Sequence, residues 1–305
     1  TYGLYRYNSH EIIPVEDCQL QSEEANAIVR TIREMLVEMK LEERIIRVMI
    51  REYVRLKEIM VVLVSPVAET VGLDELAVKL AGKYSAIKSV ILNVSSIMTN
   101  TVLGREDHLL YGSEYIQDRL GGLTFKISAH SFYQVNTHET EVLYGKAIEL
   151  AGLAGDEEVL DLYCGTGTIG LLAASRCHRV TGVELVEQAI KDAKENAVIN
   201  GIENAEFHCG DAGEVTGRLV SQGRHFDCIF VDPPRKGCSE QTIALLRKLA
   251  SGRIVYVSCN PATLARDLAV LKHDYTVETI VPVDMFPQTY HCEVVVSMSR
   301  VGSRL

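Results

Sequence analysis

The pattern of hydrophobic and polar positions changes its character near residue 129. Before this point, apolar residues recur with helical spacing over about Ser22 to Lys40 and over about Leu73 to Lys83. Apolar runs of strand length accompany these two helices, and they lie at 45–53, 59–65, 89–94, 109–110 and 123–127. This mixture predicts a small α+β domain over residues 1–128, with antiparallel pairing of its strands.

After residue 129, short apolar runs alternate with helical segments. The runs lie at 158–162, 180–183, 205–208, 228–231 and 254–257, and helical segments include 186–199, 240–249 and 261–271. Such β–α alternation predicts a doubly wound parallel sheet over residues 129–305. Two last runs, 276–281 and 294–298, are close enough in sequence to form an antiparallel pair at one sheet edge. We therefore expect an α/β protein with a smaller α+β domain in front.

Composition limits the classes of protein that fit. The chain has 305 residues, 47% of them hydrophobic and 24% charged, which is enough for two domains with cores. No apolar stretch approaches the ~20 residues of a membrane span and the first residues lack a signal-peptide pattern, so we expect a cytoplasmic protein. The net charge of -10 weighs against an obvious nucleic-acid binder. Eight cysteines without Cys-x-x-Cys spacing indicate neither a zinc site nor a disulfide framework.

A glycine-rich turn follows the first strand of the second domain. Gly165, Gly167 and Gly170 match the pattern G-x-G-x-x-G between a strand and a helix, where a nucleotide can approach the backbone. Glu184, at the end of the next strand, is placed to accept hydrogen bonds from ribose hydroxyls. These features fit a nicotinamide-dependent dehydrogenase and an S-adenosylmethionine enzyme equally well.

The fourth strand of this domain favours the second class. It runs into Asp232 to Gly237, which reads Asp-Pro-Pro-Arg-Lys-Gly. A carboxylate and a rigid Pro-Pro segment then lie at the carboxyl end of a central strand, where open α/β sheets bind ligands. A dehydrogenase has no evident use for this segment, whereas in methyltransferases an Asp-Pro-Pro turn borders the transferring methyl group.

Cys259 is the candidate nucleophile. It stands in Ser-Cys-Asn-Pro, directly after the fifth strand and before a predicted helix. The partial positive charge of a helix N-terminus lowers a thiol pKa, so we expect Cys259 to have a lowered pKa and thiolate character. A lone cysteine is more often a small buried hydrophobic residue. Cys259 directly follows a strand, as do the glycine-rich turn and the Asp232 to Gly237 segment. This shared placement favours a catalytic role for Cys259 instead.

Five ordered motifs together resemble the RNA uracil-5-methyltransferase family. They occupy 131–136, 161–170, 232–237, 258–261 and 284–293. The chain is most similar to the bacterial members that make 5-methyluridine in 23S ribosomal RNA, and the resemblance extends over nearly its whole length. It implies a Rossmann-like, class I S-adenosylmethionine-dependent methyltransferase domain. The implied activity is methylation of uridine C5, expected in 23S rRNA, with a tRNA uridine-5-methyltransferase as the alternative.

The resemblance also implies roles for individual residues. Cys259 would add to C6 of uracil and make C5 nucleophilic, and Glu293 would remove the C5 proton. The cofactor residues that the resemblance and the glycine loop indicate are Gln134, Tyr163, Gly165, Glu184 and Asp232. Asp211, after the third strand, is a weaker candidate for the adenine, and its alternative role is a helix N-cap.

The implied substrate is RNA with an accessible base. The target uridine has to leave any stack to reach a buried thiol, so a single-stranded loop or an opened stem of ribosomal RNA is expected. Arg235 and Lys236 are candidates for RNA contact or for ordering their loop, with surface ion pairs as the alternative. Phe132 and Tyr133 could stack on a base or pack against the sheet. We predict no obligate protein partner and no membrane association.

The sequence departs from the family pattern in one respect. Many members carry an N-terminal β-barrel RNA-binding domain and a four-cysteine iron-sulfur cluster, and we expect neither in this chain. Cys18 resembles the fourth cluster ligand without its partners, so no metal site is predicted. Cytosine-5 methyltransferases place Pro-Cys where Pro234 and Arg235 stand here, which favours uracil. An NAD-dependent oxidoreductase and a non-catalytic RNA-binding module are the alternatives from other classes.

Overall fold

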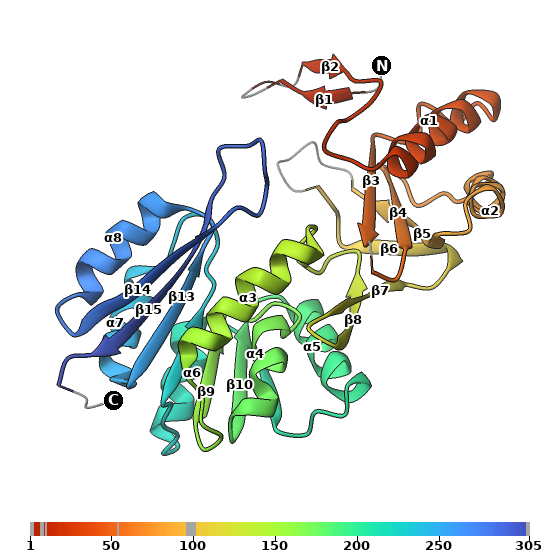
Figure 1. Cartoon of the computed structure of the whole chain (residues 1–305). Coiled ribbons are helices and arrows are strands. Elements are labelled where there is room, and N and C mark those ends of the chain that lie inside the picture. The colour runs from red at the N-terminus through yellow and green to blue at the C-terminus, as the bar shows by residue number, and fades with distance from the viewer. Residues whose placement is uncertain (1–2, 7–8, 10, 54, 96–101, 303–305) are drawn as a thin grey trace. The chain divides into compact units, whose positions relative to one another are not determined.

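The chain forms two compact units, Thr1–Ile116 and Gln117–Leu305 (Figure 1). The computed structural model describes all residues except 1–2, 7–8, 10, 54, 96–101 and 303–305. The division lies earlier in the chain than the one at 128/129 that the sequence indicates.

The first unit is a four-stranded sheet with two helices, preceded by a small hairpin. Its elements are β1 (Gly3–Tyr5), β2 (Ile12–Pro14), α1 (Glu23–Glu38), β3 (Arg47–Tyr53), β4 (Glu58–Ser65), α2 (Leu73–Lys83), β5 (Ile87–Val94) and β6 (Glu106–Gly112). Helix α1 begins where the sequence predicts, because the Ser22 side chain accepts a hydrogen bond from the Ala25 N–H at 2.9 Å. Ile28 and Ile32 of α1 and Leu76 of α2 pack on the inner face of the sheet.

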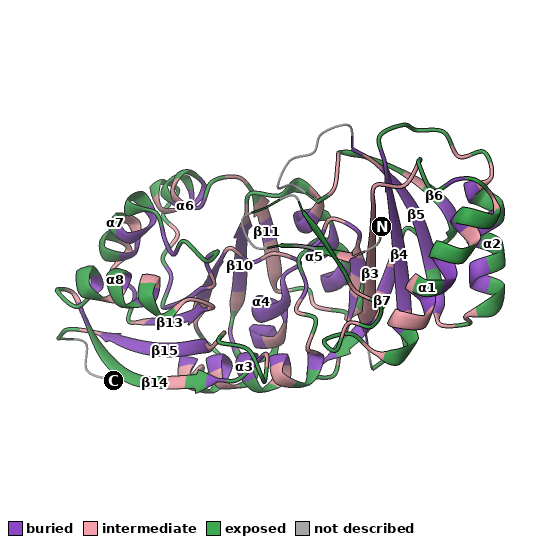
Figure 2. Cartoon of the chain, turned by 90° about the horizontal axis from the view of Figure 1, so that it is seen from above, coloured by how far each residue is buried: buried purple, intermediate pink, exposed green. Residues whose placement is uncertain are grey.

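The sheet order β3-β4-β5-β6 corrects one expectation about strand direction. β3 pairs antiparallel with β4 and β5 pairs antiparallel with β6, but β4 and β5 run parallel. Helix α2 connects β4 to β5, and such a crossover returns the chain in the same direction. Figure 2 shows β4 and β5 buried along most of their length, with the outer faces of the helices exposed.

The second unit contains a seven-stranded sheet of the order β11-β10-β9-β12-β13-β15-β14. Its strands are β9 (Glu158–Leu162), β10 (Arg179–Glu184), β11 (Ala205–Cys209), β12 (Cys228–Val231), β13 (Arg253–Ser258), β14 (Tyr275–Val283) and β15 (Glu293–Arg300). The first five are parallel, and β15 pairs antiparallel with both β13 and β14. The predicted doubly wound sheet and its antiparallel edge pair are therefore confirmed.

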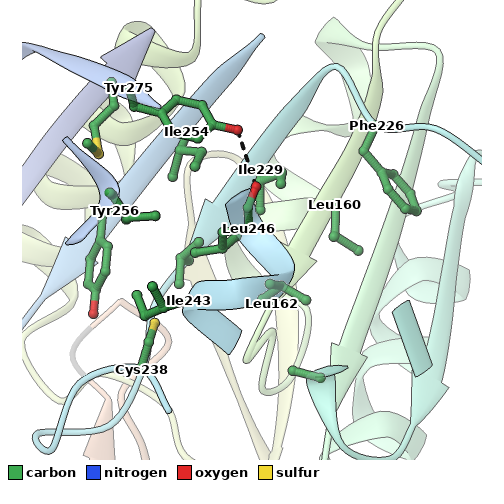
Figure 3. Packing of buried hydrophobic residues seen from close by; sticks show 14 of the residues in the cluster. Leu160, Leu162, Phe226, Ile229, Cys238, Ile243, Leu246, Ile254, Tyr256 and Tyr275 are labelled. Atoms are coloured by element: carbon green, nitrogen blue, oxygen red, sulfur yellow. Dashed lines mark hydrogen bonds between the residues drawn. The ribbon is translucent and has the colours of Figure 1, made fainter. Parts of the chain in front are cut away.

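Helices cover both faces of this sheet. They are α3 (Thr137–Ala151), α4 (Thr168–Ala173) with the short 3-10 turn η1 (Ala174–Arg176), α5 (Glu187–Ile199), α6 (Ala212–Ser221), α7 (Glu240–Leu249) and α8 (Pro261–Leu271). The core under α6, α7 and α8 joins apolar residues of neighbouring strands to the helices (Figure 3). Leu160, Ile229 and Ile254 lie fully buried there, and the Tyr275 hydroxyl donates to the Leu246 carbonyl at 3.3 Å.

A hairpin of β7 (Tyr115–Leu120) and β8 (Leu123–Ser128) packs on α5, which explains the earlier division of the chain. The side chains of Asn196 on α5 and of Asn200, the C-cap of this helix, accept hydrogen bonds from the Lys126 and Thr124 N–H groups, respectively. The Asn200 amide also donates to the Thr124 carbonyl at 2.7 Å. Strand β8 therefore belongs with the second unit, although its sequence precedes the β–α alternation.

Candidate active site

The predicted motifs meet at one edge of the large sheet. Strand register aligns Leu162 with Val183 on one side and with Val231 on the other, and Val231 with Tyr256. The residues after these strands therefore gather at the carboxyl ends of β9, β10, β12 and β13, where doubly wound sheets bind ligands. The glycine loop, Asp232 and Cys259 all lie at this edge.

The glycine loop needs its glycines for conformation and for space. Gly165 and Gly167 have φ angles of 54° and 79°, in the left-handed region that favours glycine. A Cβ atom on Gly167 would lie 2.9 Å from the Phe207 ring. The Gly165 N–H donates to Glu184 Oε2 at 3.2 Å, and the other Glu184 oxygen accepts from the Leu185 and Val186 N–H groups. Glu184 thus fixes the loop through backbone contacts.

A pocket opens between this loop and the segment before α3. The described residues that line it include Phe132, Tyr133, Gln134, Thr140, Tyr144, Asp161, Tyr163, Gly165, Thr168 and Asp232. Four of the predicted cofactor residues are therefore brought together, namely Gln134, Tyr163, Gly165 and Asp232. Tyr163 has a positive φ of 63°, and its hydroxyl is hydrogen-bonded to Thr242 Oγ1 of α7 at 2.9 Å.

The other two predicted cofactor residues lie outside the lining of this pocket. Glu184 contacts the back of the glycine loop, as described above. Asp211 is exposed and caps α6, because its Oδ1 accepts from the Gly213 and Glu214 N–H groups at 2.8 and 3.2 Å. This is the N-cap that the sequence offers as the alternative role for Asp211.

Carboxylates give the pocket an unusual electrostatic character. Asp161 is fully buried, and its Oδ2 accepts from the Gly170 N–H at 2.9 Å while its Oδ1 has no partner within the described part of the chain. Burial raises the Asp161 pKa to about 7, and the Glu184 charge adds to the effect. Desolvation raises the pKa of half-buried Asp232 well above its ordinary value, as do the charges of Glu293 and Asp161. A cation in the pocket would relieve this repulsion.

Cys259 and Glu293 lie near each other at the same edge, since the Glu293 charge acts on the Cys259 thiol. The antiparallel register pairs Ser258, the last residue of β13, with Val294, and Cys259 and Glu293 are the residues next to this pair. Glu293 is 5% exposed, and burial raises its pKa while the Arg235 charge opposes the shift. The pairing of β13 with β15 thus brings together residues 259 and 293, which are far apart in the sequence.

The expected lowering of the Cys259 pKa is wrong. Burial raises the pKa of this thiol, and so do the Glu293 and Asp232 carboxylates, while the Arg235 charge lowers it. Asn260, the N-cap of α8, accepts from the Ala262 N–H at 3.1 Å and so occupies a donor of the first helical turn. Burial, together with the Glu293 and Asp232 charges, therefore outweighs the effect of the helix terminus on the thiol pKa.

Helix α8 holds the Asp232–Gly237 loop beside Cys259, a role that the sequence analysis missed. The Arg235 carbonyl accepts from Asn260 Nδ2 at 3.1 Å and from Thr263 Oγ1 at 3.2 Å. Arg266 donates to the Lys236 carbonyl at 3.0 Å. Cys259 and the Pro-Pro loop therefore both lie at the N-terminal end of α8.

Asp267 is the buried centre of this α8 contact. It is 2% exposed, and its Oδ2 accepts from the Cys238 N–H at 2.9 Å and from the Tyr256 hydroxyl at 2.7 Å. Its Oδ1 accepts from Arg266. The signal in the sequence is an acidic residue at a helical core position, since Leu264 and Leu271 lie on the same face of α8.

Tyr144 of α3 is a second residue that the sequence analysis missed. It is 4% exposed, and its hydroxyl is hydrogen-bonded to the Gln134 side chain. Burial raises its pKa well above the ordinary value, and the Asp232, Asp161 and Glu293 charges act in the same direction. Tyr144 therefore keeps its proton and lies among the three carboxylates.

The predicted RNA-contacting residues differ in their surroundings. Arg235 and Lys236 are exposed, and the charge of Arg235 acts on both Glu293 and Cys259. Tyr133 is 5% exposed and packs against Phe125 with ring centroids 5.8 Å apart, so it takes the packing role. Phe132 is 70% exposed at the pocket.

Cys18 lies in the first unit, where its N–H donates to Asn26 Oδ1 at 2.8 Å. Over the part of the chain that the structure describes, no group of three or more His, Cys, Asp or Glu side chains could hold a metal ion. Within the same residues, no helix combines the length and apolar character that a membrane span requires.

Comparison with known sequences identifies the protein family to which this chain belongs. The sequence profile described as tRNA (Uracil-5-)-methyltransferase matches residues 2–301. The chain belongs to this family. Membership favours the methyltransferase interpretation of the glycine loop over the dehydrogenase one.

Individual members of the tRNA (uracil-5-)-methyltransferase family are similar over almost the whole chain. A protein of Bacillus cereus named as an uncharacterized RNA methyltransferase is 44% identical over 308 residues, covering 98% of this chain and 67% of its own. One from Clostridium tetani with the same name is 40% identical, covering 99% of this chain and 68% of its own. The chain thus spans about two thirds of the length of these relatives.

A solved structure shares the fold. The tRNA (uracil-54, C5)-methyltransferase of Pyrococcus abyssi, in complex with S-adenosyl-L-homocysteine, superposes with a TM-score of 0.79 at 29% sequence identity. The match covers 96% of this chain and 72% of that one. The large sheet is accordingly the Rossmann-like sheet of class I S-adenosylmethionine-dependent methyltransferases.

Proposed function

We propose that this chain transfers the methyl group of S-adenosylmethionine to C5 of a uridine in RNA. The observation that carries the proposal is the placement of Cys259 near Glu293, at the sheet edge that also bears the pocket with Asp232. A soft nucleophile and a buried carboxylate at one point are the two groups that C5 methylation of uracil requires.

The pocket residues fit S-adenosylmethionine. The unpartnered Asp161 oxygen and the repelling carboxylates favour a cationic ligand, and a sulfonium is a cation. Gln134, Tyr163, Gly165 and Asp232 would hold the cofactor, with Glu184 fixing the glycine loop. When bound, the cofactor supplies an electrophilic methyl group. In the relative from Pyrococcus abyssi, the bound molecule is S-adenosyl-L-homocysteine.

The protein residues would act on the uracil in sequence. Cys259 loses its proton to solvent water and its sulfur bonds to C6, so the electron pair of the C5=C6 π bond moves toward C5 and makes that carbon nucleophilic. After C5 has taken the methyl group, Glu293 removes the C5 proton. The electron pair of that C–H bond restores the C5=C6 double bond and expels the Cys259 thiolate. The raised pKa of Glu293 makes its carboxylate a stronger base.

Two RNA classes are candidates for the substrate. The resemblance of the motifs supports 23S rRNA, whereas the similarity to a tRNA (uracil-54, C5)-methyltransferase favours tRNA as the second candidate. In both, an unpaired or extruded uridine would enter beside Phe132, with Arg235 and Lys236 available to phosphates. Action in the cytoplasm without an obligate protein partner is part of the same proposal.

The test is methyl transfer to both RNA classes by the wild-type chain and by Cys259→Ala. Each protein is incubated with S-adenosylmethionine and with a 23S rRNA or a tRNA transcript, and 5-methyluridine is measured by nucleoside mass spectrometry. We expect 5-methyluridine from the wild type in one of the two RNAs and none from the variant. An active variant would refute the role of Cys259, and 5-methylcytidine as product would refute the choice of base.

A further inference from the structure

The loop before Glu293 presents an aromatic ring to solvent. Tyr290 is 90% exposed, the largest value among the large hydrophobic side chains that the structure describes. An isolated exposed apolar residue requires no explanation by itself. The surroundings of Tyr290, however, show that its ring is part of an ordered aromatic array.

Three rings form this array. The centroids of Tyr290 and His291 are 4.2 Å apart with the planes tilted by 40°, and those of Phe286 and His291 are 6.5 Å apart in an edge-to-face arrangement. Phe286 and His291 are half-buried. Tyr290 is therefore the outermost ring, with His291 on its inner side and solvent around the rest.

The backbone of the loop is fixed by its own hydrogen bonds. Thr289 Oγ1 donates to the Phe286 carbonyl at 2.7 Å and accepts from the His291 N–H at 3.2 Å. Asn136, the N-cap of α3, donates to the Met285 carbonyl at 2.9 Å. Gln288 has a φ of 71°, a conformation that costs a non-glycine residue energy. The chain thus maintains a strained turn that displays Tyr290.

The array lies next to the proposed reaction site. Only two residues separate Tyr290 from Glu293, so their Cα atoms are within about 11 Å of each other. Arg235 and Lys236 are exposed, and the Arg235 charge acts on Glu293, so cations flank the same site. An aromatic face beside cationic groups is the combination that binds single-stranded nucleic acid.

We propose that Tyr290, supported by His291, is a stacking platform for an unpaired nucleobase next to the target uridine. The ligand is a base of the single-stranded RNA, recognised by its face rather than by its hydrogen-bonding edge. The inference rests on the proposed function, since it takes the substrate to be RNA. It adds a contact that sets RNA affinity and contributes nothing to the chemistry of the methyl transfer.

The first experiment uses the fact that the chain contains no tryptophan. Tyr290→Trp introduces a single fluorophore on the platform. The control, Val301→Trp, places it after the far end of β15, about 26 Å along the strand from Glu293, where Val301 is 60% exposed. Each protein is titrated with a ten-nucleotide oligouridylate and with an abasic oligomer of the same length, at low salt.

Stacking predicts that oligouridylate quenches the emission of Tyr290→Trp, whereas the abasic oligomer leaves it unchanged. Neither oligomer should change the emission of Val301→Trp. Equal responses of Tyr290→Trp to both oligomers would show that only phosphates are bound there and would overturn the proposal. The absence of any response would overturn it as well. This readout needs no methyl transfer, so it succeeds or fails separately from the proposed function.

The second experiment measures methylation of the RNA that serves as substrate. Tyr290→Ala removes the stacking contact with one base, so we expect it to raise the KM for RNA about tenfold with little change in kcat. Tyr290→Phe, which keeps the ring, should restore the wild-type KM. S-adenosylmethionine affinity, measured by calorimetry, should be the same in all three proteins. A KM in Tyr290→Ala equal to that of the wild type would contradict the platform.

Discussion

Cys259 and Glu293 flank the last residue pair of strands β13 and β15, Ser258 with Val294, and the Glu293 charge raises the Cys259 pKa. Paired residues of antiparallel strands have Cα atoms about 4.5–5.5 Å apart, so the neighbours of this pair leave the sheet at the same edge. This relationship brings together a thiol and a carboxylate, which are the proposed nucleophile and the proposed base.

The first prediction separates the roles of these two residues. In the proposed mechanism the thiolate is expelled only after the C5 proton has been removed, so Glu293→Gln should accumulate a covalent complex between Cys259 and RNA. The complex would appear as a slowly migrating band on a denaturing gel of labelled RNA, and it should form only with S-adenosylmethionine if methylation precedes the block. The double variant Cys259→Ala/Glu293→Gln is the control and should give no band. A band in the double variant would place the covalent bond on another residue.

The second prediction concerns the conformation of the glycine loop. Gly167→Ala should lower the free energy of unfolding by about 1–3 kcal/mol, because φ is positive there and the new methyl group would meet the Phe207 ring. Gly217→Ala on α6 is the matched control, since its Cβ would have no neighbour within 4 Å. Helix propensity predicts that this control gains about 0.5–1 kcal/mol. Urea denaturation measures the change in the free energy of unfolding for both variants, and equal changes would refute the packing argument.

The third prediction tests the contact of α8 with the Pro-Pro loop. Asp267→Ala leaves the buried Tyr256 hydroxyl and the Cys238 N–H without their acceptor, which should destabilise the protein by about 2–4 kcal/mol. Because Asp267 also orders the loop that follows Asp232, kcat for methylation should fall in addition. Asp274→Ala, which breaks the surface ion pair with Arg247, is the control and should cost at most about 1 kcal/mol. An Asp267→Ala protein with wild-type kcat would show that the contact only stabilises the fold.

The fourth prediction follows from the pKa of about 7 for Asp161. Below pH 7 this carboxyl is protonated in the free protein, and above pH 7 it carries the charge that attracts a sulfonium. S-adenosylmethionine should therefore bind more tightly as the pH rises from 5.5 to 7.5, by at most about tenfold per pH unit, and should release a proton below pH 7. S-adenosylhomocysteine, which lacks the charge, should show a weaker dependence. Calorimetry in buffers of different ionisation enthalpy measures both quantities.

Asp161→Asn is the control for this pH dependence. Its amide oxygen can still accept from the Gly170 N–H, while the titrating group is gone. We expect the variant to bind S-adenosylmethionine with a flatter pH profile. The same group should make the free wild-type protein less stable as the pH rises from about 4 to 7, since in this window the folded state binds more protons than the unfolded state. A variant with an unchanged pH profile would assign the titration to another group.

The sequence by itself determined the elements whose signals are local. The bounds of α2, α7, α8, β9 and β12 follow from apolar periodicity and from their flanking residues, and strand–helix alternation indicated the doubly wound sheet. It also predicted that the glycine loop, Asp232 and Cys259 lie at one edge of the sheet, because the carboxyl ends of parallel strands share that edge and these motifs follow those strands. The hairpin of β7 and β8 could not be assigned to its unit in this way, since its attachment depends on Asn196 and Asn200 of a later helix.

Only the tertiary structure decided the pKa values of the groups at the site and the contacts that hold its loops. A helix terminus is visible in the sequence and suggests a lowered Cys259 pKa, but burial in the folded protein raises this pKa, and so do the charges of Glu293 and Asp232 from separate segments. The role of Asp267 also depends on the fold, because its two hydrogen-bond donors, Tyr256 and Cys238, lie on separate segments of the chain. Periodicity reports contacts between near neighbours in the chain, whereas electrostatic energies depend on distances through space, and these are set when the sheet assembles.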